Sequence, residues 1–140
     1  MPKWVDDGFT DYAMRMSQEV TIELLKIKPE KRSKNIKISQ LLSAEAKRIH
    51  AVLPPKCRTI VMDECGRHWS TVKLADSISS WMGNGGDTAF IIGGADGLDS
   101  KIKKSADEVL ALSALTLPHG LVRVLLVEQL YRAVSLIRRH

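Results

Sequence analysis

The chain has 140 residues, of which 44% are hydrophobic and 26% charged, as expected for one globular domain with a real core. Lysine and arginine number 21 against 16 acidic residues, and the net charge of +5 weakly favours a polyanion such as RNA as partner. The two cysteines match no zinc or disulfide pattern, no apolar run is long enough for a membrane span, and the polar first residues argue against a signal peptide, so we expect a reduced, cytoplasmic protein.

Hydrophobic periodicity predicts alternating helices and strands. Apolar residues that recur every three or four positions indicate helices, and short apolar or alternating runs indicate strands. In chain order the pattern predicts a helix over residues 4–16, a half-buried strand over 20–24, a loop over 28–35, a helix over 38–52, a strand over 59–62, a loop over 63–70, a helix over 74–82, a strand over 90–92, a short helix, a strand over 109–112 and a last helix over 121–137. This order indicates an α/β fold, in which helices cover both faces of a parallel sheet, and no linker divides residues 1–140 into two domains.

A glycine-rich loop follows the strand over residues 90–92. Its sequence, GGADG over residues 93–97, is not the dinucleotide fingerprint and on its own is more often a tight turn. Its place after a buried strand favours a ligand, because ligands of α/β proteins bind at the carboxyl ends of parallel strands.

A second loop, residues 113–118, is apolar yet irregular. We expect such a loop to bury itself, and its backbone groups then need hydrogen-bond partners. The edge of an adenine ring would supply them while Leu115 and Leu117 pack on its faces, although a plain connection is the alternative.

Charged residues on the last helix and before it are open to two interpretations. His119 at the helix start is either structural or a group that accepts a proton near neutral pH. Glu128 and Arg132 have the spacing of a surface ion pair, and Arg123 among apolar neighbours requires a phosphate or an acidic partner.

A basic cluster spans residues 26–37 and includes Lys31, Arg32 and Lys34. A solvated surface is the ordinary interpretation of such a run, and phosphate contacts along an RNA backbone are the functional one. His68 and Trp69 lie in a separate predicted loop, where Trp69 is either a stacking platform or part of the core. No metal-binding motif is present, and we expect no metal.

Two long motifs carry a resemblance to a known family. The segments IGGADG and LSALTLPHGLVRVLLVEQLYRA, together with Pro2-Lys3-Trp4, residues 31–35 and Asp63, resemble the ribosomal RNA large-subunit methyltransferase H family, which belongs to the SPOUT class of α/β-knot methyltransferases. The resemblance covers essentially the whole chain. The family adds a strand before the Met-Pro-x-Trp segment and a short tail with a Tyr and a His after the position of His140.

The resemblance implies a function and a set of site residues. The fold would be a trefoil-knotted α/β domain, a homodimer that uses S-adenosylmethionine to methylate ring nitrogen N3 of a pseudouridine in 23S large-subunit ribosomal RNA on assembled ribosomes. The cofactor would lie against Met62, Gly94 and the loop of Ser113, Ala114, Leu115, Thr116, Leu117 and Pro118. His119 and Glu128 are the candidates for taking the proton from the base. Lys31, Arg32, Lys34, Arg123 and Arg132 are the candidates for RNA contacts.

Two other functions remain open from the sequence. A non-catalytic RNA-binding module would keep the fold and the RNA affinity but transfer no methyl group. A nucleotide-binding oxidoreductase would bind a nicotinamide cofactor in place of S-adenosylmethionine.

Overall fold

The structure, a computed structural model, describes residues 1–31 and 33–138. Within them lies a parallel sheet of three strands in the order β2-β1-β3. The central strand β1 (Arg58–His68) pairs with β2 (Thr88–Ile92) on one side and β3 (Glu108–Ala111) on the other. The helices are α1 (Lys3–Arg15), α2 (Ile38–Val52), α3 (Thr71–Asn84), α4 (Ser100–Ser105) and α5 (His119–Arg138).

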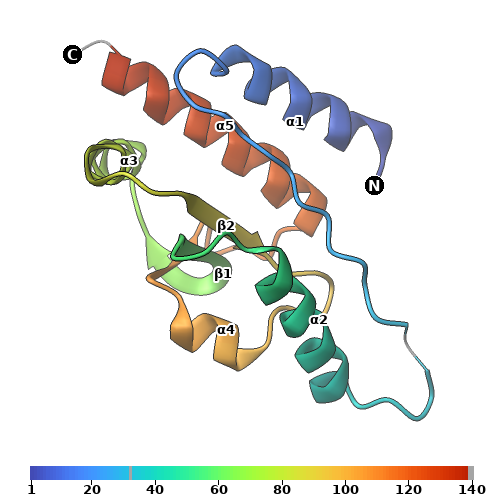
Figure 1. The fold of residues 1–140 in the computed structure, drawn as a ribbon. Coiled ribbons are helices and arrows are strands. Elements are labelled where there is room, and N and C mark those ends of the chain that lie inside the picture. The colour runs from blue at the N-terminus through green and yellow to red at the C-terminus, as the bar shows by residue number, and fades with distance from the viewer. Residues whose placement is uncertain (32, 139–140) are drawn as a thin grey trace.

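Helices cover both faces of the sheet, as predicted (Figure 1). The helices α1, α3 and α5 lie on one face, and α2 and α4 lie on the other. The central strand alternates between the two cores, because successive side chains of a strand point to opposite faces. Ile60 and Met62 pack into the core beneath α3 and α5, whereas Val61 packs against α2 and α4. Ile60 and Val61 are completely buried, so both cores exclude water from β1.

Side-chain caps begin two of the helices. Ser70 caps α3 by accepting a hydrogen bond from the Lys73 backbone N–H at 3.1 Å, and Gly85 ends that helix with a φ of 76°. Asp99 caps α4 in the same way, accepting from the Lys101 N–H at 2.8 Å. Helix α2 ends at Val52, just before the two prolines.

The predicted strand over residues 20–24 is wrong. These residues are extended, with Val20, Ile22 and Leu24 half-buried and Thr21 and Glu23 exposed, but they pair with no strand among the described residues. Alternation reports which side chains face the core, whereas a strand also needs a neighbour for its backbone hydrogen bonds. The segment instead runs from one core to the other (Figure 1), since Val20 and Ile22 pack against the cluster to which α3 and α5 contribute, and Ile27 packs against the α2 and α4 core.

The predicted loop over residues 63–70 is also wrong, because β1 continues to His68. The strand changes register on β3 between Met62 and Arg67, so residues 63–66 form an irregularity and pairing then resumes. Gly66 makes this possible. A Cβ there would lie 2.7 Å from backbone atoms of Val109 and Leu110, and only glycine allows so close an approach.

Trp69 belongs to the core rather than to a stacking platform. It is half-buried, packs against the core beneath α3 and α5, and lies 6.3 Å from Trp81 between ring centroids. No helix within the described ranges 1–31 and 33–138 combines the length and apolarity needed to cross a bilayer.

Candidate functional site

Three candidate segments meet at one edge of the sheet because the strands that precede them are parallel and in register. Met62 of β1 is opposite Ile92 of β2 and Leu110 of β3. The glycine loop begins directly after Ile92, and the apolar loop begins shortly after Leu110. The structure therefore brings Met62, Gly94 and residues 113–118 to the carboxyl-terminal edge of the sheet, where α/β proteins bind ligands.

The glycine loop is a tight turn whose glycines have different roles. The Gly97 N–H donates to the Gly94 carbonyl at 3.0 Å, and Gly97 has a φ of 83°. A Cβ on Gly93 would lie 2.9 Å from the Gly97 backbone, so Gly93 is required by the turn itself. A Cβ on Gly94 would meet no atom within 4 Å, and its φ is not positive. The fold therefore does not require glycine at position 94, which leaves open backbone there for a ligand.

The apolar loop does not bury itself, contrary to expectation. Leu115 is 72% exposed, and Ala114, Thr116 and Pro118 are also exposed. The loop is held instead by polar links, because the Leu115 N–H donates to the Ser113 hydroxyl at 3.0 Å. A large apolar side chain in this position is a surface that a ligand or another chain would cover.

Asp63 and Glu64 also lie at this edge, and their part in holding it is a feature that sequence reasoning missed. The Thr116 hydroxyl donates to the Glu64 carboxylate at 2.6 Å, which joins the apolar loop to β1. Asp63 forms an ion pair with Lys103 of α4 at 3.2 Å, and its carboxylate also accepts from the Cys65 N–H. Their place directly after the buried residues of β1 was the available signal, since such residues reach the edge of a parallel sheet.

The two candidates for proton transfer do not come together within the chain. His119 is the exposed first residue of α5, and Glu128 lies nine residues further along, about 14 Å away at ~1.5 Å per residue. Glu128 is engaged by Arg132 at 2.6 Å and by the Gln129 amide at 2.8 Å. Only His119, which directly follows the apolar loop, stays next to the candidate cofactor residues.

The candidate RNA contacts are dispersed. Arg123 is mostly buried and forms an ion pair with Asp6 of α1 at 3.4 Å, which is the acidic alternative that its apolar setting predicted. Arg132 is exposed but paired with Glu128. Lys31 and Lys34 are exposed on the segment before α2, and Arg32 lies outside the described residues.

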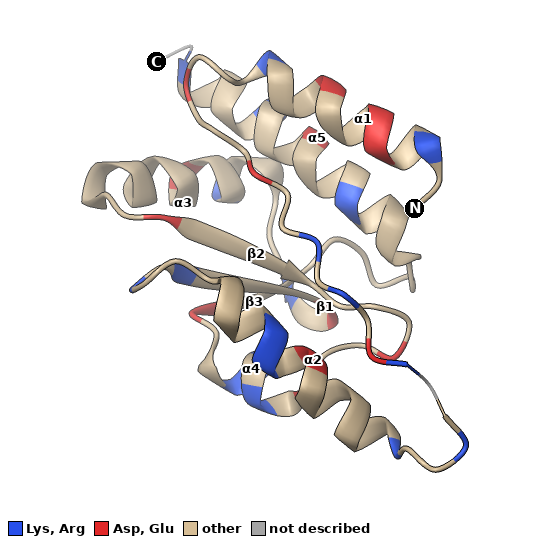
Figure 2. Ribbon diagram, turned by 45° about the vertical axis from the view of Figure 1, so that its right-hand side comes forward, with Lys and Arg blue, Asp and Glu red and all other residues tan. Residues whose placement is uncertain are grey.

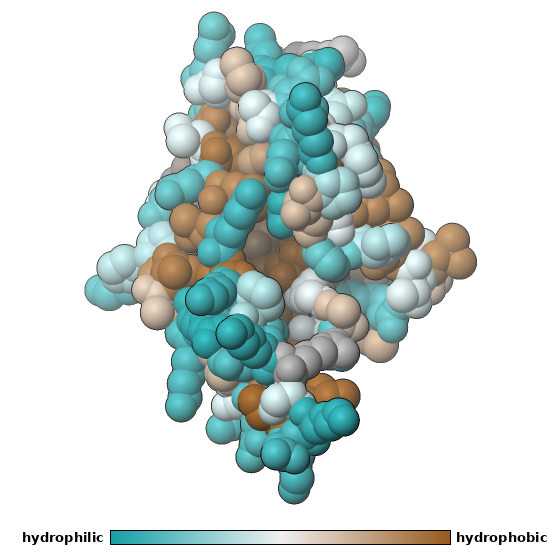
Figure 3. Space-filling model, turned by 90° about the vertical axis from the view of Figure 1, so that its right-hand side faces the viewer, coloured by the Kyte–Doolittle hydropathy of each residue, from teal (hydrophilic) through white to brown (hydrophobic). Residues whose placement is uncertain are grey.

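The surface on the side of this edge carries apolar side chains between polar ones. β2 points toward the right-hand side of Figure 1, and Figure 3 faces that side. A band of hydrophobic residues crosses the middle of this surface, with hydrophilic residues above and below it. Within residues 1–31 and 33–138, no group of three His, Cys, Asp or Glu side chains is placed to hold a metal ion. The site thus suits a ligand with an apolar aromatic portion and a polar tail.

Comparison with known proteins gives full-length matches. The family model described as "Predicted SPOUT methyltransferase" matches residues 1–140. The ribosomal RNA large subunit methyltransferase H of Nitrosospira multiformis is 64% identical over 140 residues, which is 100% of this chain and 90% of that protein. Proteins of the same name from Nitrosomonas eutropha and Chromobacterium violaceum are 54% and 51% identical, with the same coverage. The similarity therefore extends over every element described above, including both loops at the sheet edge.

Proposed function

The chain belongs to the SPOUT methyltransferase family, as the resemblance predicted, and from this premise we propose that it methylates ring nitrogen N3 of a pseudouridine in large-subunit ribosomal RNA, with S-adenosylmethionine as the methyl donor. The observation that carries the proposal is the edge where Met62, Gly94 and residues 113–118 converge. The similarity to methyltransferases of three organisms extends over the whole of this chain, and it supports methyl transfer as the reaction at this edge.

The residues present fit the cofactor. Open space above Gly94 leaves room for a ligand against bare backbone, and the exposed Leu115 offers an apolar surface for a flat ring. The backbone groups of residues 113–118 would hydrogen-bond the adenine edge, and Met62 would close the apolar floor at the end of β1. The cofactor supplies a methyl group that its sulfonium already activates.

The protein has two tasks in this reaction. It must align the acceptor nitrogen with the methyl carbon, which lowers the entropic part of the barrier. It must also help the imide N–H of the base to lose its proton. His119 is the better placed of the two candidates, because it directly follows the apolar loop, whereas the Glu128 carboxylate is already occupied by Arg132 and Gln129.

The wider setting follows from the family. We infer one domain over residues 1–140 with the knotted backbone of SPOUT proteins, working as a homodimer on ribosomal RNA or the assembled ribosome in the cytoplasm. The large apolar side chains that α1, α3 and α5 leave exposed support the dimer, because a second chain would cover them.

Methyl transfer to ribosomes tests the proposal. Large subunits or ribosomes that lack the modification, mixed with the protein and labelled S-adenosylmethionine, should gain one methyl group per ribosome, and digestion should locate it on N3 of a pseudouridine. RNA binding without transfer would indicate a non-catalytic module. Binding of a nicotinamide cofactor with no affinity for S-adenosylmethionine would indicate an oxidoreductase.

A further inference from the structure

The helices on the two faces of the sheet differ in charge (Figure 2). Helices α2 and α4, on one face, carry five lysines and arginines and a single acid. Helices α1, α3 and α5, on the other, carry six basic and five acidic residues. The net charge of the chain is thus concentrated on the α2 and α4 layer, and a polyanion would be attracted to that layer.

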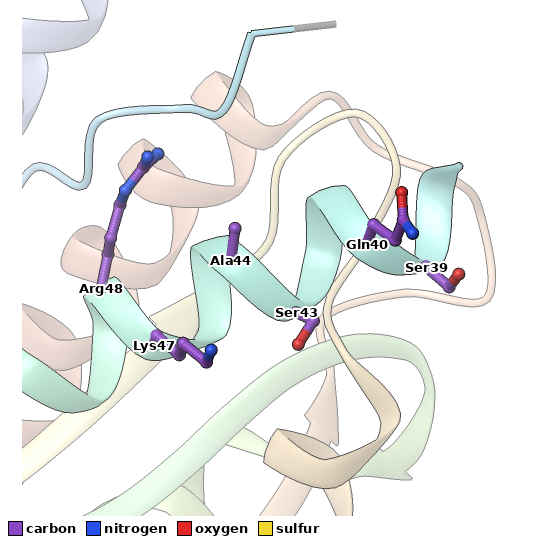
Figure 4. A pocket seen from close by; sticks show the side chains of 6 residues that line it. All are labelled: Ser39, Gln40, Ser43, Ala44, Lys47 and Arg48. Carbon is purple, nitrogen blue, oxygen red and sulfur yellow. The ribbon is translucent and has the colours of Figure 1, made fainter. Parts of the chain in front are cut away.

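A shallow, open hollow lies on α2. Its volume is about 530 Å³, and it is lined by Ser39, Gln40, Ser43, Ala44, Lys47 and Arg48 (Figure 4). Ser39, Ser43 and Lys47 extend to one side of the helix at intervals of four residues, which makes a row of two hydroxyls and one cation. Ala44 is the one apolar residue of the lining. The row offers hydrogen-bond donors and a positive charge to a phosphate backbone.

The acid of α2 is turned away from this row. The Glu45 carboxylate accepts a hydrogen bond from the Glu30 N–H at 3.1 Å. Arg48 donates to the Glu30 carboxylate at 2.6 Å and to the Lys28 carbonyl at 2.8 Å. These contacts hold Lys28 and Glu30, within the basic cluster of residues 26–37, against α2. They leave Lys47 as the unpaired exposed cation among the described residues of the hollow.

Helix α4 adds two further cations beside α2. The two helices lie next to each other under the sheet (Figures 1 and 2) and share a core that includes Ala46, Ile49 and Ile102. Lys101 and Lys104 are exposed and three residues apart, so they lie on one side of α4. Lys103 is instead held by Asp63, and Asp99 is the capping residue at the start of the helix.

We propose that the α2 and α4 layer is the face on which the ribosomal RNA backbone lies, with Lys47, Lys101 and Lys104 contacting phosphates and Ser39 and Ser43 donating hydroxyl hydrogen bonds. This inference rests on the proposed function. A lysine is a mobile point charge without base preference, so this face contributes affinity and orientation, and the sheet edge selects the base. The opposite layer is less suited to a polyanion because its acids offset its cations.

The salt dependence of RNA binding tests the proposal. The variant Lys47→Ala/Lys104→Ala removes two cations from exposed positions of this face, and Lys3→Ala/Lys73→Ala removes two from exposed positions of α1 and α3. Binding to large subunits should lose about two units of slope in a plot of log affinity against log salt for the first pair, since each phosphate contact contributes roughly one. The control pair should keep the wild-type slope to within about half a unit.

Three outcomes are decisive. Equal slopes for the two pairs would overturn the assignment of this face, even if the wild type methylates ribosomes. Loss of slope in Lys47→Ala/Lys104→Ala, restored in Lys47→Arg/Lys104→Arg, would establish it. A wild type that neither binds nor methylates ribosomes would refute the proposed function itself. Unchanged calorimetric binding of S-adenosylmethionine by both alanine pairs would show that the variants are folded and that the cofactor edge is intact.

Discussion

A substitution at Gly94 should affect cofactor binding without affecting the fold. Its added Cβ would meet nothing within 4 Å, so Gly94→Val should fold normally. A branched side chain would nevertheless occupy the space proposed for the cofactor. We expect the affinity for S-adenosylmethionine, measured by calorimetry, to fall by about tenfold or more, the equivalent of ~1.4 kcal/mol.

The control for Gly94→Val is Gly83→Val. Gly83 also has open space around its Cβ position and no positive φ, but it lies in α3. The wild type and the Gly83 variant should bind the cofactor equally. Unchanged affinity in the Gly94 variant would place the cofactor elsewhere.

Gly66 has the opposite character, because the fold itself requires it. Its added Cβ would lie 2.7 Å from backbone atoms of β3, which cannot rotate away as a side chain could. Gly66→Ala should therefore lower the free energy of unfolding by about 1–3 kcal/mol, as overpacking usually does. Urea denaturation measures this, and Gly83→Ala should leave the stability unchanged or raise it by up to about 1 kcal/mol. Equal midpoints for both variants would show that β1 does not approach β3 so closely.

At the scale of the element, the periodicity of apolar side chains predicted where helices and strands lie. It did not predict which extended segments have a neighbouring strand for their backbone hydrogen bonds. The helices and the strands over residues 90–92 and 109–112 lie where their apolar patterns placed them, within a few residues at each end, whereas the strand predicted over residues 59–62 continues to His68. The segment over residues 20–24 shows the limit, because an alternating pattern cannot reveal whether a neighbouring strand exists.

Some features of the candidate site could likewise be predicted from the sequence, and others could not. The glycine loop and the apolar loop each follow a predicted strand. Because the strands of such a sheet are parallel, the sequence alone predicted that both loops lie at one edge. The hydrogen bond between Thr116 and Glu64 could not be predicted, because the two residues are 52 positions apart in the sequence. Their contact also depends on the irregular path of β1 after Met62. The exposure of Leu115 was unpredictable for a related reason, because polar links rather than burial hold its loop.

The Glu64–Thr116 hydrogen bond gives the prediction at this scale. It connects the apolar loop to β1, so Glu64→Ala should loosen the loop and weaken the binding of S-adenosylmethionine several-fold, as expected for the loss of a hydrogen bond worth about 1 kcal/mol. Glu64→Gln keeps a carbonyl acceptor and should restore most of the affinity. Calorimetry on both variants decides the matter. Equal losses in both would mean that the carboxylate charge, not the bond to Thr116, is responsible.

At the scale of the whole molecule, most of the exposed large apolar residues of the helices lie on α1, α3 and α5, although α2 also exposes Ile38 and Val52. Helices α1, α3 and α5 leave large apolar side chains in solvent: Trp4 is 57% exposed, Val72 62% and Leu125 37%. Exposed apolar residues on three neighbouring helices are typical of a surface that another chain covers. The acids and bases of these helices nearly balance, which favours contact between two copies, because like charges would otherwise repel.

Leu125 on α5 therefore tests the homodimer. The variant Leu125→Glu places a charge on the proposed interface, where burial without a partner is unfavourable. We expect the wild type to sediment as a dimer at micromolar concentration and the variant to dissociate at least about tenfold more readily, a change of ~1.4 kcal/mol. Val52→Glu is the matched control, because Val52 is 44% exposed at the end of α2 on the opposite face and should leave the dimer intact. A wild type that remains monomeric at micromolar concentration would refute the dimer. Dissociation by the Val52 variant alone would move the interface to the α2 and α4 layer, and the proposed RNA face would then be covered.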